Sequence, residues 1–209
     1  MTPSGTRALL VAALLALVAS VPPAAGAERV IVVLGDSLTA GFGLTPDEAF
    51  PAVLEQKLRR EGYSYRVVNA GVSGDTTAAG LRRVDWVLRS QPAIAIVALG
   101  ANDGLRGQSV TAMRDNLLEI VRRLRAAGAT VLLTGMRVPS NYGPDYTRAF
   151  AAVFPAVARA TGAPLAPFLL DGVAGNARLN QPDGIHPTAE GQRIIANRLW
   201  PYLEPLLRR

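Results

Sequence analysis

Residues 29–41 of the chain read RVIVVLGDSLTAG. Five consecutive apolar side chains, from Val30 to Leu34, are followed at once by a turn of small and polar residues. A short apolar run that ends in this way is typical of a strand buried on both faces, as in a parallel sheet. The segment therefore predicts a buried strand from Arg29 to Leu34 whose carboxyl end opens into a polar loop.

The same pattern recurs further along the chain. Three more strands are predicted at Tyr65 to Asn69, Ile94 to Leu99 and Thr130 to Thr134, with a weaker fifth near Pro164 to Phe168. Longer segments of helical period separate them. This alternation predicts an α/β fold in which helices cover both faces of a parallel sheet.

Two of the helical segments carry end signals. Ser109 can cap one helix and Gly128 can end it. The last helix should begin around Pro187, and Pro201 should kink or interrupt it. The apolar face of the first helix holds Met113, Leu117, Ile120, Val121 and Leu124. The inward side chains of the last helix are expected to be Ile194, Ile195, Leu199, Tyr202 and Leu203.

Length and composition predict one domain after a leader. The chain has 209 residues, 49% of them hydrophobic, which suits one core formed by residues 28–209. In residues 1–27 the single charged side chain, Arg7, precedes an apolar run from Ala8 to Val18, and the segment ends in Ala25-Gly26-Ala27. This order is typical of a signal peptide, so we expect an exported protein, periplasmic or secreted. An uncleaved anchor is the alternative.

Several partners and chemistries are disfavoured by the composition. No later stretch reaches the roughly 18 apolar residues that a membrane helix needs, so no stable span is expected after cleavage. The net charge of +6 comes from scattered arginines, with Lys57 the only lysine, and no clustered stripe indicates nucleic acid. The chain has no cysteine and one histidine, which argues against a metal site. We expect a monomer.

Polar, glycine-rich loops follow the first three predicted strands. They read GDSLTAG (35–41), AGVSGDTTAAG (70–80) and GANDGLRG (100–107). In an open parallel sheet, ligands bind beyond the carboxyl ends of the strands, near the point where the strand order reverses. The chemistry of the protein is therefore expected in these loops.

A possible nucleophile, base and acid are spread over the chain. Ser37 follows the first strand, and a serine hydroxyl needs a base to take its proton. His186 is the one histidine available, and DGIHP places Asp183 three residues before it, with Pro187 suited to the first position of a helix. Alone, each of these residues is more often structural. Together they match a set in which the carboxylate holds the imidazole in the tautomer that accepts the serine proton.

Gly74 and Asn102 could stabilise the charge that develops on a carbonyl oxygen. A glycine lets its backbone N–H approach closely, and an asparagine amide donates a hydrogen bond without adding charge. Their alternative interpretations are a plain turn glycine and a turn-forming asparagine. For either residue taken alone, the turn-forming interpretation is the stronger one.

Four segments together resemble the SGNH (GDSL-type) hydrolases, closest to the branch of bacterial periplasmic thioesterase I, lysophospholipase L1 and arylesterase. They are GDSLTAG with Ser37, VSGDT with Gly74, GANDGLRG with Asn102 and DGIHP with Asp183 and His186. The resemblance implies a three-layer α/β/α fold with a five-stranded parallel sheet in flavodoxin-like order, and no cofactor. It also implies cleavage of carboxylic esters or thioesters by Ser37. The N–H of Ser37, the N–H of Gly74 and the Asn102 side chain would form the oxyanion hole.

Other features refine this interpretation or leave it open. Ala101 stands where many relatives have a second glycine, which puts the local backbone path in question. We expect Leu105, Tyr142 and Ile185 to border the substrate, and residues 138–146 either border the acyl groove or form a polar surface loop. Three alternatives are a carbohydrate acetylesterase of the same fold, a noncatalytic binding module and a nucleotide-binding protein. The last is disfavoured because GDSLTAGFG lacks the GxGxxG spacing.

Overall fold

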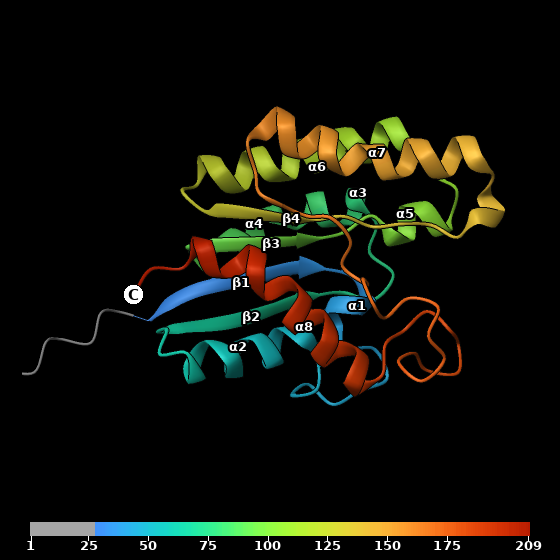
Figure 1. The fold of residues 1–209 in the computed structure, drawn as a ribbon. Coiled ribbons are helices and arrows are strands. Elements are labelled where there is room, and N and C mark those ends of the chain that lie inside the picture. Colours follow the sequence, from blue (N-terminus) through green and yellow to red (C-terminus); the bar gives the residue numbers. More distant parts are fainter. Residues whose placement is uncertain (1–27) are drawn as a thin grey trace, which may run out of the picture.

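A five-stranded parallel sheet forms the centre of the molecule (Figure 1). The computed structural model describes residues 28–209, and the predicted leader lies outside these residues. The strand order is β2-β1-β3-β4-β5. The strands are β1 (Arg29–Gly35), β2 (Tyr65–Gly71), β3 (Ile94–Ala98), β4 (Thr130–Thr134) and β5 (Leu165–Ala166). All five predicted strands are confirmed, and β4 has the predicted bounds.

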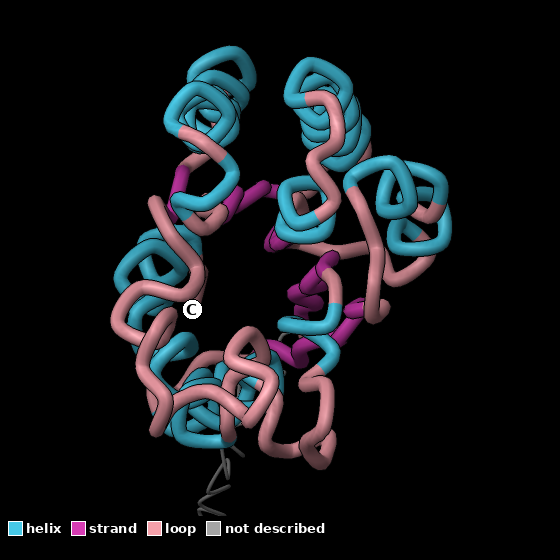
Figure 2. Tube along the Cα trace, turned by 90° about the vertical axis from the view of Figure 1, so that its right-hand side faces the viewer, coloured by secondary structure: helices cyan, strands magenta, loops and turns pink. Residues whose placement is uncertain are grey.

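Helices cover both faces of the sheet, which gives the expected three layers (Figures 1 and 2). On one face lie α2 (Phe50–Arg60) and α8 (Ala189–Leu203), and on the other lie α3 (Thr77–Arg82), α4 (Val84–Leu88), α6 (Val110–Ala126) and α7 (Pro144–Thr161). Short helices α1 (Ser37–Ala40), α5 (Ala101–Leu105), η1 (Ser140–Tyr142) and η2 (Glu204–Leu206) complete the elements. No helix within residues 28–209 combines the length and the apolarity needed to cross a membrane.

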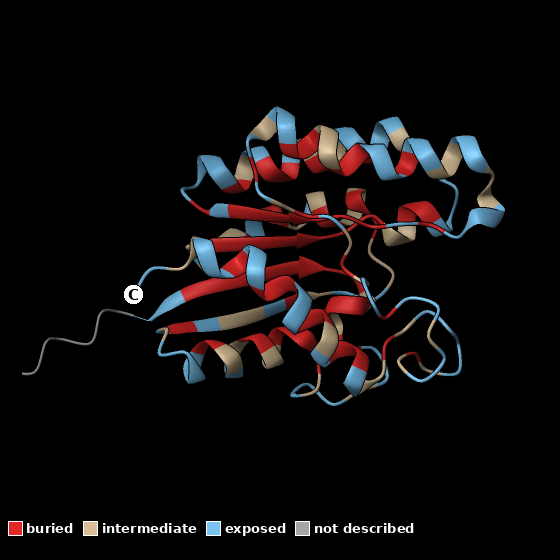
Figure 3. Cartoon of the chain, viewed as in Figure 1, coloured by how far each residue is buried: buried red, intermediate tan, exposed pale blue. Residues whose placement is uncertain are grey.

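Burial explains why the strand sequences are so apolar. β1 and β3 lie inside the sheet and are buried almost throughout, whereas β2 forms an edge and exposes Arg66 and Asn69 (Figure 3). Helix α6 buries the predicted apolar face against the sheet. Its ends are also as predicted, because Ser109 Oγ accepts a hydrogen bond from Ala112 N and Gly128 follows the C-cap with a φ of 90°.

Strand order reverses at β1, with β2 on one side of it and β3 on the other. The chain leaves β1 to form β2, then returns past β1 to form β3. The loops after these three strands therefore meet at one edge of the sheet, where a crevice forms in folds of this kind.

The last helix differs from its prediction in three respects. It begins at Ala189 instead of Pro187. Thr188 is the N-cap, because its side chain accepts a hydrogen bond from Gly191 N. It also continues through Pro201 to Leu203, since the proline removes only one hydrogen bond close to the helix end. Tyr202 is 38% exposed because Leu199 and Leu203 occupy the buried face.

Candidate active site

Ser37 is the first residue of α1, directly after the carboxyl end of β1. The preceding Asp36 caps this turn, since its Oδ1 accepts a hydrogen bond of 3.0 Å from Leu38 N. The cap fixes the backbone on both sides of Ser37. The hydroxyl consequently stands at the sheet edge, where it meets residues from the other end of the chain.

His186 and Asp183 lie next to this hydroxyl. His186 Nε2 is 3.0 Å from Ser37 Oγ, and His186 Nδ1 is 2.7 Å from Asp183 Oδ2. The second carboxylate oxygen, Oδ1, accepts the backbone N–H groups of Ile185 and His186, both at 3.0 Å. The structure thus brings together the three residues that the sequence pointed to, in the expected order of contacts.

The environment of Asp183 keeps its carboxylate ionised. The hydrogen bond from the His186 backbone lowers its pKa most, followed by those from the His186 side chain and the Ile185 backbone, to about 2. The side chain is 39% exposed, so burial does little to oppose this effect. Asp183 is therefore a fixed negative charge that can orient the imidazole at neutral pH.

Phe42 covers one side of the imidazole. Its ring centroid lies 4.4 Å from that of His186, with the planes tilted by 33°. Gln181 Nε2 donates hydrogen bonds to the carbonyl oxygens of Phe42, at 2.6 Å, and Pro187, at 3.0 Å. This one amide joins the loop after α1 to the loop that carries His186, and so supports the position of both rings.

Gly74 and Asn102 line the same cleft as Ser37 and His186. Gly74 has a φ of 84°, a backbone conformation that glycine adopts without strain. Asn102 Nδ2 donates to the carbonyl oxygen of Asp75 at 3.0 Å and to Asp36 Oδ2 at 3.3 Å. Both donor candidates from the sequence therefore line the same cleft as the hydroxyl, and two hydrogen bonds hold the Asn102 amide in a defined orientation.

The substitution at Ala101 leaves this arrangement intact. The residue with the unusual backbone is Gly100, whose φ is 116°, and Ala101 begins α5 with ordinary helical geometry. Of positions 100 and 101, only Gly100 therefore has the left-handed backbone that favours glycine. Asn102 keeps its place in the first turn of α5.

Asp36 has a strongly perturbed carboxyl group. The residue is fully buried, and this burial raises its pKa to about 6, although the hydrogen bonds from Leu38 and Asn102 act in the opposite direction. The sequence pointed to Ser37 and passed over its neighbour. The sequence did contain a signal of this raised pKa, because an aspartate directly after a buried strand has little access to water.

Arg83 ties two of the site's loops together. Its guanidinium donates to the carbonyl oxygens of Gly35 and Ala70, both at 2.7 Å, and pairs with Asp75 at 2.6 Å. Gly35 precedes the nucleophile loop and Asp75 follows Gly74. Sequence reasoning missed this residue because nothing local to residue 83 indicates contacts with residues 35 and 75.

The cleft in front of Ser37 has a volume of about 770 Å³. Leu105 and Ile185 line it as expected, but Tyr142 does not. The Tyr142 hydroxyl instead donates to the carbonyl oxygen of Leu105 at 2.7 Å, so Tyr142 supports a lining residue from behind. Of residues 138–146, Val138 and Pro139 reach the cleft and the rest of the segment lies outside it.

Comparisons with known proteins show the family of the chain. Residues 33–194 match the GDSL-like lipase/acylhydrolase family. The chain belongs to this family. Among GDSL-like relatives, the esterase TesA of Pseudomonas aeruginosa is 45% identical over 202 residues, which cover 96% of this chain and all of TesA.

Two further comparisons extend the family relationship. The thioesterase 1/protease 1/lysophospholipase L1 of Escherichia coli is 39% identical over 88% of this chain and 87% of its own. A crystal structure of TesA superimposes with a TM-score of 0.83 at 44% identity, covering 86% of this chain and all of that one. The fold of this GDSL-like chain is thus shared with an esterase of known structure.

Proposed function

We propose that the chain hydrolyses carboxylic ester and thioester bonds through an acyl-enzyme on Ser37. The observation that carries the proposal is the continuous series of contacts from Ser37 Oγ through His186 to Asp183, at 3.0 Å and 2.7 Å, in the wall of a cleft. The relatives named esterase and thioesterase 1/lysophospholipase L1 support this substrate class.

The first half of the reaction forms the acyl-enzyme. Ser37 Oγ attacks the acyl carbonyl carbon while its proton moves to Nε2 of His186. Charge on the carbonyl oxygen is stabilised by the N–H groups of Ser37 and Gly74 and by the Asn102 amide. Of the two hydrogen bonds that Asn102 makes, the longer one, to Asp36, is the one that this oxygen replaces.

Departure of the alcohol or thiol completes the acyl-enzyme, and hydrolysis then releases the acid. The imidazolium, stabilised by the ionised Asp183, gives its proton to the departing oxygen or sulfur as the carbon–heteroatom bond breaks. Water then attacks the acyl-enzyme, losing a proton to His186, and the proton passes on to Ser37 Oγ as the acid leaves. No other proton carrier is needed.

Ser37→Ala tests the assignment directly. The variant should lose turnover of aryl acetates and acyl thioesters and should no longer be labelled by a fluorophosphonate, while its unfolding transition stays close to that of the wild type. Ser140→Ala, an exposed serine in η1, is the matched control and should keep both activity and labelling. A folded Ser37→Ala protein with wild-type turnover would refute the mechanism, and absence of labelling in the wild type would favour a binding module.

We further propose that the protein acts after export. The pattern of residues 1–27 supports a cleaved leader, and β1 begins at Arg29, just beyond it. Expression of the full chain, cell fractionation and N-terminal sequencing test this. A mature protein that starts near residue 28 outside the cytoplasm is expected, and a cytoplasmic protein with an intact N-terminus would contradict it.

A further inference from the structure

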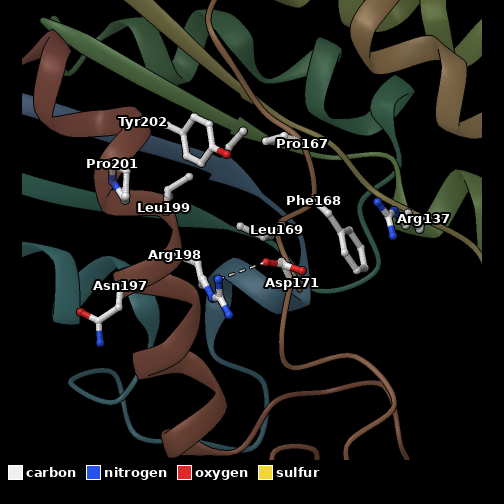
Figure 4. A pocket seen from close by; sticks show the side chains of 11 residues that line it. Arg137, Pro167, Phe168, Leu169, Asp171, Asn197, Arg198, Leu199, Pro201 and Tyr202 are labelled. Carbon is white, nitrogen blue, oxygen red and sulfur yellow. Dashed lines mark ion pairs between the residues drawn. The ribbon is translucent and has the colours of Figure 1, made fainter.

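A second cavity of about 370 Å³ adjoins the catalytic cleft. It lies between the C-terminal half of α8 and the segment that follows β5 (Figure 4). Two of its lining residues, Arg137 and Phe168, also line the cleft, so the two hollows meet at these side chains. Arg137 and Phe168 thus form the boundary between the cleft and the second cavity.

Arg137 lies at the junction, the place where the cleft and the second cavity share lining residues, and its guanidinium has no carboxylate partner among the described residues. Its guanidinium carbon lies 4.9 Å from the centre of the Phe168 ring, a cation–π contact that keeps the side chain in place. Within residues 28–209, Arg137 is the one arginine or lysine among the side chains that line the cleft, and no carboxylate pairs with it.

Nearby acidic groups do not neutralise this charge. Asp36, the carboxyl group that lines the cleft, is buried and accepts hydrogen bonds from Leu38 and Asn102. In the second cavity, Asp171 faces the other arginine, Arg198, at 3.5 Å (Figure 4). Among the described residues, no carboxylate thus compensates the charge of Arg137 at the junction.

A guanidinium held in this way suits an anion of fixed geometry. Its planar array of five N–H donors matches phosphate or carboxylate oxygens in pairs, and a side chain already stacked loses little freedom on binding. The cleft itself is walled by apolar side chains such as Leu105, Leu170 and Ile185, which fit an acyl chain. The second cavity adds the hydroxyl of Tyr202, a polar group that fits the other half of a substrate.

We propose that Arg137 recognises an anionic group on the leaving-group half of the substrate, and that the second cavity holds the portion beyond that group. The anion is a phosphate ester, carried either by a phosphorylated thiol or by a phospholipid headgroup. This proposal rests on the hydrolase activity proposed above and concerns which esters or thioesters that site prefers.

Matched substrates show whether Arg137 recognises the negative charge of the leaving group or affects hydrolysis in general. Arg137→Gln is assayed on two thioesters with the same acyl chain, one on coenzyme A, whose phosphates are anionic, and one on neutral N-acetylcysteamine. A lost hydrogen bond to a charged group predicts a kcat/KM about tenfold lower or more for the coenzyme A thioester, mainly through KM, with the neutral thioester changed by less than about twofold. Arg159→Gln on α7, which lines neither hollow, is the control.

A second pair of substrates distinguishes the two sources of phosphate. Lysophosphatidylglycerol and a monoacylglycerol with the same chain are compared in the same way. A selective loss in the first pair assigns the phosphorylated thiol, and a selective loss in this pair assigns the phospholipid headgroup. Equal losses on charged and neutral substrates in both pairs, or no loss on either charged one, would overturn the proposal. Wild-type protein that hydrolyses aryl acetates but none of the four substrates would also overturn it, whereas inactivity on aryl acetates as well would refute the hydrolase function itself.

Tyr202→Trp tests the second cavity separately. Tyr202 is 38% exposed and its side chain points toward Pro167 across the cavity (Figure 4), so a larger ring can fill the cavity without disturbing the core. We expect a raised KM for the preferred anionic substrate and unchanged kinetics on its neutral counterpart. An unaltered KM for the anionic substrate, with the cavity shown to be filled, would remove this cavity from the substrate site.

Discussion

The side chain of Gln192 in α8 donates a hydrogen bond of 3.1 Å to the carbonyl oxygen of Leu38, in the short helix that begins with Ser37. The oxygen of the same carboxamide accepts the N–H of Phe50 at 2.9 Å, at the start of α2. Gln192 is 1% exposed, so water has no access to replace these partners. One buried amide therefore joins the last helix to the nucleophile turn and to the first long helix.

Gln192→Met should destabilise the protein and disturb the turn that carries Ser37. Methionine keeps the volume but leaves a buried N–H and a buried carbonyl without partners, which predicts a loss of about 2–4 kcal/mol in the free energy of unfolding. Urea denaturation measures this loss. Gln56→Met, at an exposed position of α2, is the control and should stay within about 0.5 kcal/mol of the wild type. Equal stability of the two variants would show that the amide is not needed.

Asp183→Asn should lower turnover by about three to four orders of magnitude. The asparagine oxygen can still accept the N–H groups of Ile185 and His186, so the loop keeps its shape. Its NH2 group then faces His186 Nδ1, which moves the imidazole proton to Nε2, the atom that must accept the serine proton. Steady-state kinetics on an aryl ester should show a reduced kcat with little change in KM. A loss confined to KM would assign Asp183 to binding instead.

Asn102→Ala should lower kcat by about 100-fold to 1000-fold, because one donor to the developing oxyanion is removed. Substrate binding should change little, since the bound ester carries no negative charge on that oxygen. Measurement of kcat and KM separately on one ester checks the expectation. Asn176→Ala, on the loop before Asn180, lies outside the cleft and serves as the control. A pure rise in KM would contradict the assigned role.

Asp36→Asn should change the dependence of stability on pH. Because burial raises the pKa of Asp36 to about 6 from 3.8, the folded protein keeps a proton that the unfolded chain releases between about pH 4 and 6. The wild type therefore loses roughly 3 kcal/mol of stability as pH rises through this range, and asparagine does not titrate. The free energy of unfolding of the variant relative to the wild type should increase from pH 4 to pH 7. A difference that is independent of pH would show that Asp36 has an ordinary pKa.

Much of the fold could be predicted because its signals are local. Continuous apolar runs marked the buried strands, and the period of 3.6 residues marked α6 together with its caps at Ser109 and Gly128. The weakest prediction was β5, and this strand is only two residues long at the sheet edge. The length of β2 was underestimated because its pairing with β1 extends to Gly71, which only the neighbouring strand determines.

The site was predictable where residue type and motif carried the signal, as for Ser37 and His186. It was not predictable where contacts between distant loops decide the role. Tyr142 supports Leu105 from outside the cleft, and this depends on how η1 packs against α5. Arg83 and Gln192 act through carbonyl oxygens 48 and 154 residues away, and a carbonyl group carries no sequence signature.

The contact between Ser37 and His186 joins residues 149 positions apart, and the strand before Ser37 is the first to be synthesised. A ribosome-bound chain that ends before residue 186 holds the serine without its base. By the mechanism proposed above, such a nascent chain lacks the base that activates its serine. The same mechanism delays full reactivity until synthesis is nearly finished, and fragments released early by truncation lack it.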